Sequence, residues 1–216
     1  MHKRLTGLYA ITDAGQHDTR QLLCDVEQAL LGGVRLLQYR HKPQPGKADP
    51  QQALDTAHAL RALTLRHDAR LIINDDPQLA HVVRADGVHL GQDDAGIDAA
   101  RRLLGAEAII GVSCYNRFEL AQQASAEGAD YIAFGRFFGS RTKPHAAQAE
   151  PALLQRARQE LTLPVVAIGG ITTDNAAALI AAGADLLAVV DGLFGQPDIQ
   201  AAARRFQTLF SAAPQR

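Results

Sequence analysis

Two aspartates, Asp75 and Asp94, each follow a short apolar run and could together form a metal site. The runs cover residues 71–73 and 87–90. The segment between them, residues 77–84, has apolar side chains at helical spacing after an Asp-Pro start. This order predicts a strand, a helix and a second strand, with the two strands parallel and their carboxyl ends on one edge. Asp75 and Asp94 would then lie close together.

Two carboxylates at one edge repel each other unless a positive charge lies between them. Mg²⁺ suits such a pair, because it prefers oxygen ligands and a phosphate-bearing substrate can complete its coordination. A structural alternative exists for the first cluster, in which Asn74, Asp75 and Asp76 only cap the helix that follows. The local pattern leaves both interpretations open.

Polar and glycine-rich segments follow other apolar runs as well. Cations occur in Gln38-Tyr39-Arg40-His41-Lys42, and hydroxyls alternate with cations in Ser140-Arg141-Thr142-Lys143. Ser113 ends a further run, and Gly169-Gly170 could expose backbone amides to a phosphate. Taken singly, each cation could be a surface charge and the glycines a tight turn. Together they predict a site for two phosphorylated groups, with a metal between the aspartates and one of them.

The histidines and tyrosines indicate less. His89 lies within an apolar run, where a packed or hydrogen-bonded histidine is at least as expected as a catalytic one. We interpret Tyr9 and Tyr131 as packing residues, with a ligand contact left open for Tyr131. No Cys–His or Ser–His pair is recognisable, so the sequence offers no candidate for nucleophilic catalysis. We assign no general base.

Apolar runs and helical patterns alternate along the whole chain, which predicts a single-domain (β/α)8 TIM barrel over residues 1–216. Function in such a barrel lies on the loops after the strands, where all the segments above are expected. The sequences Gly128-Ala129-Asp130 and Gly183-Ala184-Asp185 are similar, as repeated units would be. The expected strands are residues 8–11, 34–40, 71–76, 87–94, 108–113, 130–135, 164–170 and 185–190.

Composition excludes several classes of protein. The chain has 216 residues, 47% of them apolar, and a net charge of −1, so neither nucleic acid nor a membrane surface is an expected partner. No apolar stretch is long enough to span a bilayer, and the start of the chain does not resemble a signal peptide. The two cysteines, Cys24 and Cys114, are expected to be reduced thiols in a cytoplasmic protein. A homo-oligomer is left open.

The chain resembles the thiamine phosphate synthase family over nearly its whole length. The resemblance implies an enzyme of thiamine biosynthesis, a transferase that joins hydroxymethylpyrimidine diphosphate to a thiazole phosphate with Mg²⁺ and releases pyrophosphate. The segments that carry it, in order along the chain, are Leu8-Tyr9-Ala10-Ile11-Thr12-Asp13, Gln38-Tyr39-Arg40-His41-Lys42, Asn74-Asp75-Asp76, His89-Leu90-Gly91-Gln92-Asp93-Asp94, Gly111-Val112-Ser113, Ser140-Arg141-Thr142-Lys143 and Ile168-Gly169-Gly170-Ile171.

The resemblance also implies residue roles. Asp75 and Asp94 would ligate the metal, and Arg40, Lys42, Ser113 and Lys143 would be the catalytic residues. The pyrimidine diphosphate would be bound by Gln38, Tyr39, Arg40, His41, Lys42, Asn74, Ser113 and Lys143. The thiazole phosphate would be bound by Ser140, Arg141, Thr142, Gly170, Val190 and Asp191.

Three positions depart from the family pattern. His41 stands where an acid is common, Ser140 where threonine is common, and Asp191 where serine is common. The carboxylate of Asp191 would repel a phosphate, so we expect its side chain to turn away while its backbone amide binds.

Three rival functions belong to proteins with a similar barrel. A thiazole tautomerase would bind a thiazole phosphate but would have little need for the aspartate pair or the cations. A phosphosugar isomerase would need a clear acid–base pair, which we cannot place. A phosphate-ligand sensor would bind without turnover.

Overall fold

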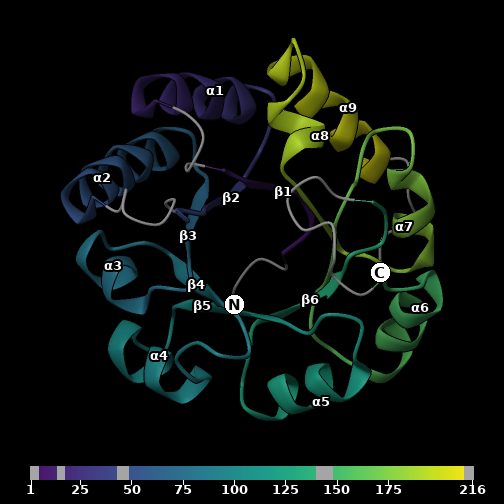
Figure 1. Ribbon diagram of the computed structural model, residues 1–216. Helices are drawn as coiled ribbons and strands as arrows, with labels where there is room; N and C mark the ends of the chain where they lie inside the picture. Colours follow the sequence, from purple (N-terminus) through teal and green to yellow (C-terminus); the bar gives the residue numbers. More distant parts are fainter. Residues whose placement is uncertain (1–4, 14–17, 43–48, 140–147, 212–216) are drawn as a thin grey trace.

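Eight parallel strands form a closed barrel, with each strand paired to its neighbours in sequence and β1 paired to β8 (Figure 1). The structure is a computed structural model that describes residues 5–13, 18–42, 49–139 and 148–211. Ser140, Arg141, Thr142, Lys143 and His145 lie outside the described residues. The strands are β1 Gly7–Ile11, β2 Leu36–Tyr39, β3 Arg70–Asn74, β4 Gly87–Leu90, β5 Ile109–Ser113, β6 Tyr131–Gly135, β7 Val165–Ile168 and β8 Leu186–Val189.

Helices surround the barrel and follow the strands in alternation, as the sequence predicted (Figure 1). The described helices are α1 Thr19–Leu31, α2 Pro50–Arg66, α3 Pro77–Val82, α4 Ile97–Leu104, α5 Phe118–Ala126, α6 Pro151–Glu160, α7 Ala176–Ala182, α8 Asp191–Phe194 and α9 Ile199–Ser211. The predicted (β/α)8 barrel is therefore confirmed. Helix α8 was not expected, because four residues are too few to show a helical apolar period.

The strands end earlier than the sequence predicted. β3 stops at Asn74 and β4 at Leu90, so Asp75 and Asp94 lie on the loops that follow. Asp75 has a positive φ of 63°, which ends the extended backbone at that residue. The loops at these carboxyl ends are the ones that can reach a ligand.

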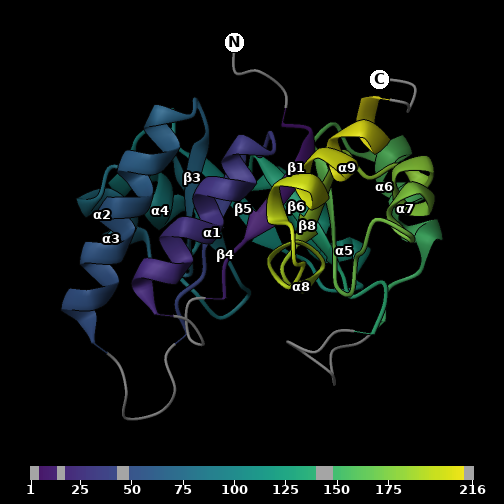
Figure 2. The same ribbon diagram turned by 90° about the horizontal axis from the view of Figure 1, so that it is seen from above.

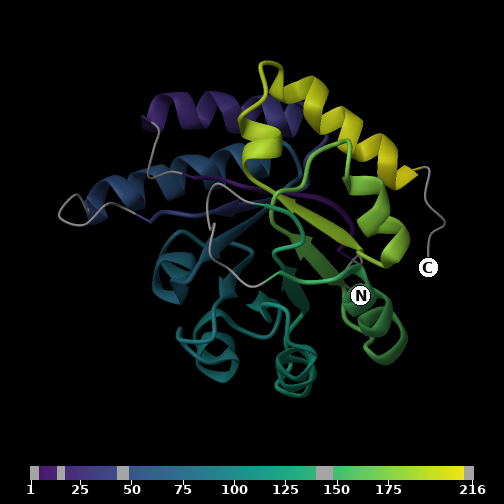
Figure 3. The same cartoon turned by 45° about the vertical axis from the view of Figure 1, so that its right-hand side comes forward.

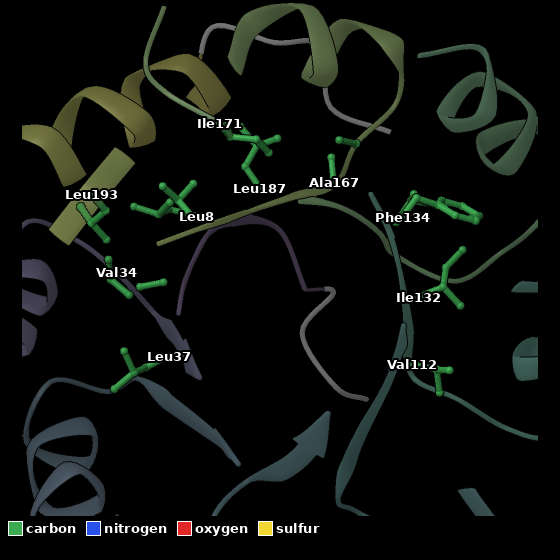
Figure 4. Close-up of a cluster of buried hydrophobic side chains, with 14 of the residues drawn as sticks. Leu8, Val34, Leu37, Val112, Ile132, Phe134, Ala167, Ile171, Leu187 and Leu193 are labelled. Carbon is green, nitrogen blue, oxygen red and sulfur yellow. The ribbon is translucent and has the colours of Figure 1, made fainter. Parts of the chain in front are cut away.

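The apolar core has two layers, because successive side chains on a strand point to opposite faces. The outer layer fills the space between the strands and the helices, and Leu8, Leu37, Ile132, Phe134 and Leu187 are among its members (Figure 4). The inner layer fills the barrel. Its fully packed residues are Tyr9, Ile11, Leu36, Ile72, Ile109, Tyr131, Ala133, Val166, Leu186 and Ala188. Burial on both faces explains why the strands are nearly continuous apolar runs in the sequence.

Three aspartates at the amino-terminal end of the barrel link neighbouring strands by the same kind of hydrogen bond. Asp86, Asp130 and Asp185 precede β4, β6 and β8, and the side chain of each accepts a hydrogen bond from a backbone N–H at the start of the preceding strand. The donors are Leu71, Ile110 and Val165, at 2.7, 2.8 and 2.9 Å. The similar Gly-Ala-Asp sequences seen before β6 and β8 thus have a structural role.

The ring of helices closes where α9 lies beside α1 (Figures 1 and 3). The side chain of Gln207 on α9 donates a hydrogen bond of 2.7 Å to the carbonyl of Gly33, just after α1. Helix α8 lies at the other end of the barrel from the start of β1 (Figure 2). Within the described part of the chain, we find no helix of the length and apolarity that a membrane crossing requires.

Candidate active site

A cavity of about 360 Å³ opens at the carboxyl ends of the strands, and all eight strands or the loops after them contribute to its wall. Its volume is in the range of pockets that bind small ligands. The structure brings many of the predicted site residues together here: Gln38, Arg40, Asn74, Ser113, Gly170, Val190 and Asp191 line the cavity. Its wall also includes Tyr9, His89, Tyr115 and Arg136, which the sequence did not assign to a site.

A chain of hydrogen bonds crosses the floor of this cavity. The Nε2 atom of Gln38 donates to the hydroxyl of Tyr9 at 2.7 Å, and the hydroxyls of Tyr9 and Tyr131 are 2.7 Å apart. The Tyr131 hydroxyl is 2.9 Å from Nδ1 of His89, and Nε2 of His89 is 3.0 Å from Oγ of Ser113. Two predicted substrate contacts, Gln38 and Ser113, are thus joined through three side chains.

Lys42, Asp75 and Asp94 lie together on the loops after β2, β3 and β4 and do not line the cavity themselves, although Arg40 and Asn74, close to them in sequence, do. The ammonium of Lys42 is 2.9 Å from Oδ2 of Asp75, and the Asp75 and Asp94 side chains interact directly. The adjacent Asp76 has a different role, since its side chain accepts a hydrogen bond of 2.9 Å from the N–H of Leu79 and caps α3. The sequence left open whether residues 74–76 belong to a metal site or cap a helix, and the structure gives different contacts to Asp75 and Asp76. Asp76 caps the helix, and Asp75 faces Asp94.

The two carboxyl groups have opposite pKa shifts. Partial burial raises the pKa of Asp75, but hydrogen bonds from Lys42 and Asp94 and the charge of Lys42 outweigh it and lower the pKa below its ordinary value. Burial and the neighbouring Asp75 raise the pKa of Asp94, against the hydrogen bond from the Gly91 N–H. Such a split is typical of two carboxyl groups that compete for one positive charge.

The donor set at this position suits Mg²⁺. Among the described residues, no group of three or more His, Cys, Asp or Glu side chains could hold a metal ion. Asp75 and Asp94 offer two carboxylates, and Mg²⁺ in phosphate-transfer sites commonly takes one or two carboxylates with substrate oxygens and water. The cation Lys42 already shows that the pair attracts positive charge.

Arg40 is held in place by two residues that directly follow β1. Its guanidinium forms an ion pair with Asp13 at 3.1 Å, and its backbone N–H donates to the hydroxyl of the buried Thr12 at 3.1 Å. The guanidinium lines the cavity and is only partly exposed. A positively charged group with a fixed position can stabilise charge that develops on a leaving group.

The glycine loop after β7 forms the opposite wall of the cavity. Gly170 has φ of 63°, and a Cβ at this position would lie 2.2 Å from the carbonyl oxygen of Gly139. Asn175 holds the loop, because its side chain accepts from the N–H of Thr172 at 2.9 Å and donates to the carbonyl of Gly170 at 3.0 Å. Only glycine fits this backbone and this close approach.

Asp191 lines the cavity at the start of α8. Its Oδ1 atom lies 2.7 Å from the place where a Cβ of Gly195 would be, so its carboxylate is beside the last residues of that helix. The expectation that this side chain turns away from a bound phosphate stays a prediction.

Tyr39 and His41 do not line the cavity. Tyr39 points out of the barrel into the layer beneath the helices and its ring stacks on His41. Burial lowers the pKa of His41. The side chain of Tyr39 is therefore poorly placed for the predicted contact, because the two-residue period of β2 directs Gln38 inward and Tyr39 outward.

Comparison with known proteins identifies the family. The family model described as thiamine monophosphate synthase matches residues 8–193. The chain belongs to this family. A thiamine-phosphate synthase of Thioalkalivibrio sulfidiphilus is 52% identical over 208 residues, which are 96% of this chain and 97% of the relative. That of Methylobacillus flagellatus is 53% identical and covers 96% of each chain.

Solved structures agree with the family assignment. A thiamine phosphate pyrophosphorylase from Pyrococcus furiosus superposes with a TM-score of 0.82 at 32% identity, covering 95% of this chain and 96% of the other. The expected enzyme, a transferase of thiamine biosynthesis on a TIM barrel, is confirmed by this membership. The tautomerase and sensor alternatives are not favoured.

Sequence reasoning interpreted Tyr9 as a packing residue and left the roles of His89 and Tyr131 open, so it did not predict that the three form one polar cluster in the site. A usable signal was present, because alternate residues of a strand point into the barrel. Tyr9 and Ile11 share one face of β1, and Tyr131 and Ala133 share one face of β6. Three polar side chains on inward positions of different strands would have indicated a shared polar cluster.

Proposed function

We propose that this thiamine phosphate synthase family member catalyses the Mg²⁺-dependent condensation of 4-amino-2-methyl-5-hydroxymethylpyrimidine diphosphate with 4-methyl-5-(2-hydroxyethyl)thiazole phosphate. The products are thiamine phosphate and pyrophosphate. The observation that carries the proposal is the contact of Asp75, Asp94 and Lys42 on the loops after the strands, the end of the barrel at which a cavity large enough for a small ligand opens. A tautomerase has little use for this charged edge.

The pyrimidine diphosphate binds on the β2 to β5 side of the cavity in this proposal. Gln38, Asn74, Arg40 and Ser113 all line the cavity, and in the proposal the first two contact the pyrimidine and the other two the diphosphate. Lys42 lies beside the aspartates and adds positive charge, and the resemblance adds Lys143. Positive groups around a diphosphate favour its departure because they match the charge that develops on it.

Asp75 and Asp94 would hold the Mg²⁺ in this arrangement. When bound, the metal supplies positive charge that stabilises the departing diphosphate. Lys42 contacts Asp75 directly, so its ammonium is also placed to compensate charge at this edge.

The proposed reaction is a dissociative substitution. The bond between the methylene carbon and the diphosphate oxygen breaks, and its electron pair leaves with the pyrophosphate. The aminopyrimidine ring stabilises the resulting cation, and the lone pair of the thiazole nitrogen forms the new carbon–nitrogen bond. The protein has to position two substrates and match charge, so no covalent nucleophile is needed. This agrees with the lack of a nucleophile pair in the sequence.

The thiazole phosphate would bind at the glycine loop. Backbone groups of Gly170, Val190 and Asp191 line the cavity on this side, and Ser140, Arg141 and Thr142 are the further contacts that the resemblance implies. The narrow approach between Gly170 and Gly139 leaves backbone, not side chains, facing the ligand.

The test is a coupling assay with purified protein and both substrates, with and without Mg²⁺, that follows thiamine phosphate. We expect product only with the metal. Binding of thiazole phosphate without product would favour the tautomerase or sensor.

In a cell we place the reaction in the cytoplasm, with these small molecules as partners. The two cysteines are free thiols, as expected there.

A further inference from the structure

Tyr9, Tyr131 and His89, the middle members of the hydrogen-bonded chain between Gln38 and Ser113, have no part in the proposed reaction, which needs neither a nucleophile nor a general base. They are nevertheless polar side chains buried inside an apolar barrel, where an unpaired hydroxyl or imidazole would cost free energy. Tyr9, Tyr131 and His89 are respectively 1%, 0% and 8% exposed. Every buried side-chain nitrogen and oxygen in the described residues has a partner.

Donors and acceptors along the chain must follow one direction. Nε2 of Gln38 can only donate, so the Tyr9 oxygen accepts from it and the Tyr9 hydroxyl donates to Tyr131. The Tyr131 hydroxyl then donates to Nδ1 of His89, which must be unprotonated. A neutral imidazole with an unprotonated Nδ1 carries its hydrogen on Nε2, which donates to Oγ of Ser113.

The opposite direction does not satisfy Tyr9. If Tyr131 donated to Tyr9, the Tyr9 oxygen would accept from both Tyr131 and Gln38, and its own hydrogen would have no acceptor among these groups. Only rotation of the Gln38 amide by 180° would allow that direction, with its carbonyl oxygen toward Tyr9. The amide orientation of Gln38, the tautomer of His89 and the hydroxyl direction of Ser113 are therefore set together.

We propose that His89, Tyr131 and Tyr9 are positioning residues that set which hydrogen-bonding groups Gln38 and Ser113 present to the pyrimidine substrate, a role that rests on the proposed function. With the direction above, Ser113 keeps its hydroxyl hydrogen to donate to a diphosphate oxygen. Gln38 keeps its carbonyl oxygen and its second N–H. An aminopyrimidine offers the complement of the Gln38 amide, because its amino group donates and its ring nitrogens accept.

Packing holds the three rings in this arrangement. The Tyr131 ring is stacked with the His89 ring at 5.6 Å between centroids and 17° between planes, and it meets Tyr9 edge-on at 5.8 Å. Gly111 on β5 makes room for it, since a Cβ there would lie 1.9 Å from the Tyr131 Cζ atom. The chain is thus a packed link through the barrel between β2 and β5.

Steady-state kinetics of Tyr131→Phe test the proposal, because this variant removes only the central hydroxyl. We expect kcat/KM for the pyrimidine diphosphate to fall on the order of 10- to 100-fold, as for other outer-shell partners of functional groups. The KM for the thiazole phosphate should stay within about twofold. Tyr9→Phe, which cuts the chain one step earlier, provides a second variant if Tyr131→Phe does not fold.

The control is Thr64→Val, which removes a fully buried hydroxyl on α2 whose hydrogen bond goes to the carbonyl of Arg61. It should lower stability without changing either KM. Wild-type kinetics in Tyr131→Phe, or equal losses for both substrates, would overturn the proposal.

The tautomer of His89 is a test that does not depend on activity. Nitrogen-15 NMR, with the His89 signal assigned from a His89→Gln variant, should show the Nε2–H form in the wild type and a mixture in Tyr131→Phe. An Nδ1–H form in the wild type would refute the direction of the chain. If the wild type failed to couple the substrates, the proposed function would fail while this measurement still decided the chain.

Discussion

At the scale of single residues, neighbours in sequence have different roles because the backbone turns between them. Asp75 has positive φ and faces Lys42 and Asp94, whereas Asp76 returns to extended backbone and caps α3. Of two adjacent aspartates, Asp75 thus carries its charge at the candidate site and Asp76 stabilises a helix. The two aspartates therefore form a matched pair for mutation.

Asp75→Asn should lower Mg²⁺-dependent coupling by about 10²–10³-fold, the loss typical when one electrostatic contact in an active site is removed. Asp76→Ala should instead lower the free energy of unfolding by about 0.5–2 kcal/mol, as loss of a helix cap does, with kcat retained. Kinetics at several Mg²⁺ concentrations and urea unfolding separate the two effects. Full activity in Asp75→Asn would refute its role.

The two cysteines also differ in their surroundings, since Cys24 is exposed and Cys114 is buried. Burial raises the pKa of Cys114 to about 12, and its sulfur donates to the carbonyl of Val112. A thiol with this pKa is almost wholly protonated at pH 8, and only the thiolate reacts. Iodoacetamide at pH 8 should label the exposed Cys24 and leave Cys114 unmodified until the protein is unfolded. Mass spectrometry of the native protein checks this, and rapid double labelling would contradict it.

At the scale of elements, three of the loops after strands are held by side-chain contacts. Asn175 holds the glycine loop after β7, Asp13 and Thr12 hold the loop after β2, and Gln92 donates a hydrogen bond of 2.6 Å to the carbonyl of Ser113. None of these side chains is a predicted ligand-binding group. They hold loops whose backbone makes few hydrogen bonds of the kind that pair neighbouring strands.

Gly170→Ala tests the glycine loop. The added methyl group would lie 2.2 Å from the carbonyl oxygen of Gly139, so we expect the loop to shift. The KM for thiazole phosphate should rise at least about tenfold, and more than the KM for the pyrimidine diphosphate. Misplacement of a binding group by about an ångström can lower the rate by still larger factors.

Gly128→Ala is the control, because Gly128 also has positive φ but has open space around it. It should show only the cost of a left-handed residue, about 1–2 kcal/mol of stability. A similar rise in both KM values for Gly170→Ala would argue against a thiazole phosphate pocket at this loop.

At the scale of the whole molecule, the barrel separates stability from activity. The amino-terminal end is closed by Asp86, Asp130 and Asp185, and the cavity opens at the carboxyl-terminal end. In this fold, residues at the carboxyl ends of the strands serve activity and those at the amino-terminal end serve stability.

Asp86→Ala tests this separation. The variant loses the hydrogen bond to the Leu71 N–H and the ion pair with Arg61 at 2.6 Å, so the free energy of unfolding should fall by about 1.5–3 kcal/mol. Both KM values and kcat should be unchanged at a temperature where the variant is folded. A selective rise in one KM would show that the two ends are coupled.

Much of the fold and part of the site could be predicted from local pattern. Alternation of buried strands with amphipathic helices has its own period in the sequence, and the order of the strands then follows from the short connections. Gln38, Asn74 and Ser113 end apolar runs, so their place at the rim was predictable. Helix α8 and the outward direction of Tyr39 depend on exact strand ends, which local pattern does not define.

Local pattern was enough to predict the eightfold alternation, the edge on which the polar loops gather and, by resemblance, the family. The folded barrel was needed to show that Lys42 contacts Asp75, that Asp76 is a cap, and that Tyr9 and Tyr131 share a hydrogen bond across 122 positions of sequence. Such contacts depend on how the barrel closes and how its strands are staggered, because these set which residues of distant strands lie at the same height along the barrel axis. The local apolar period of the sequence does not specify that stagger.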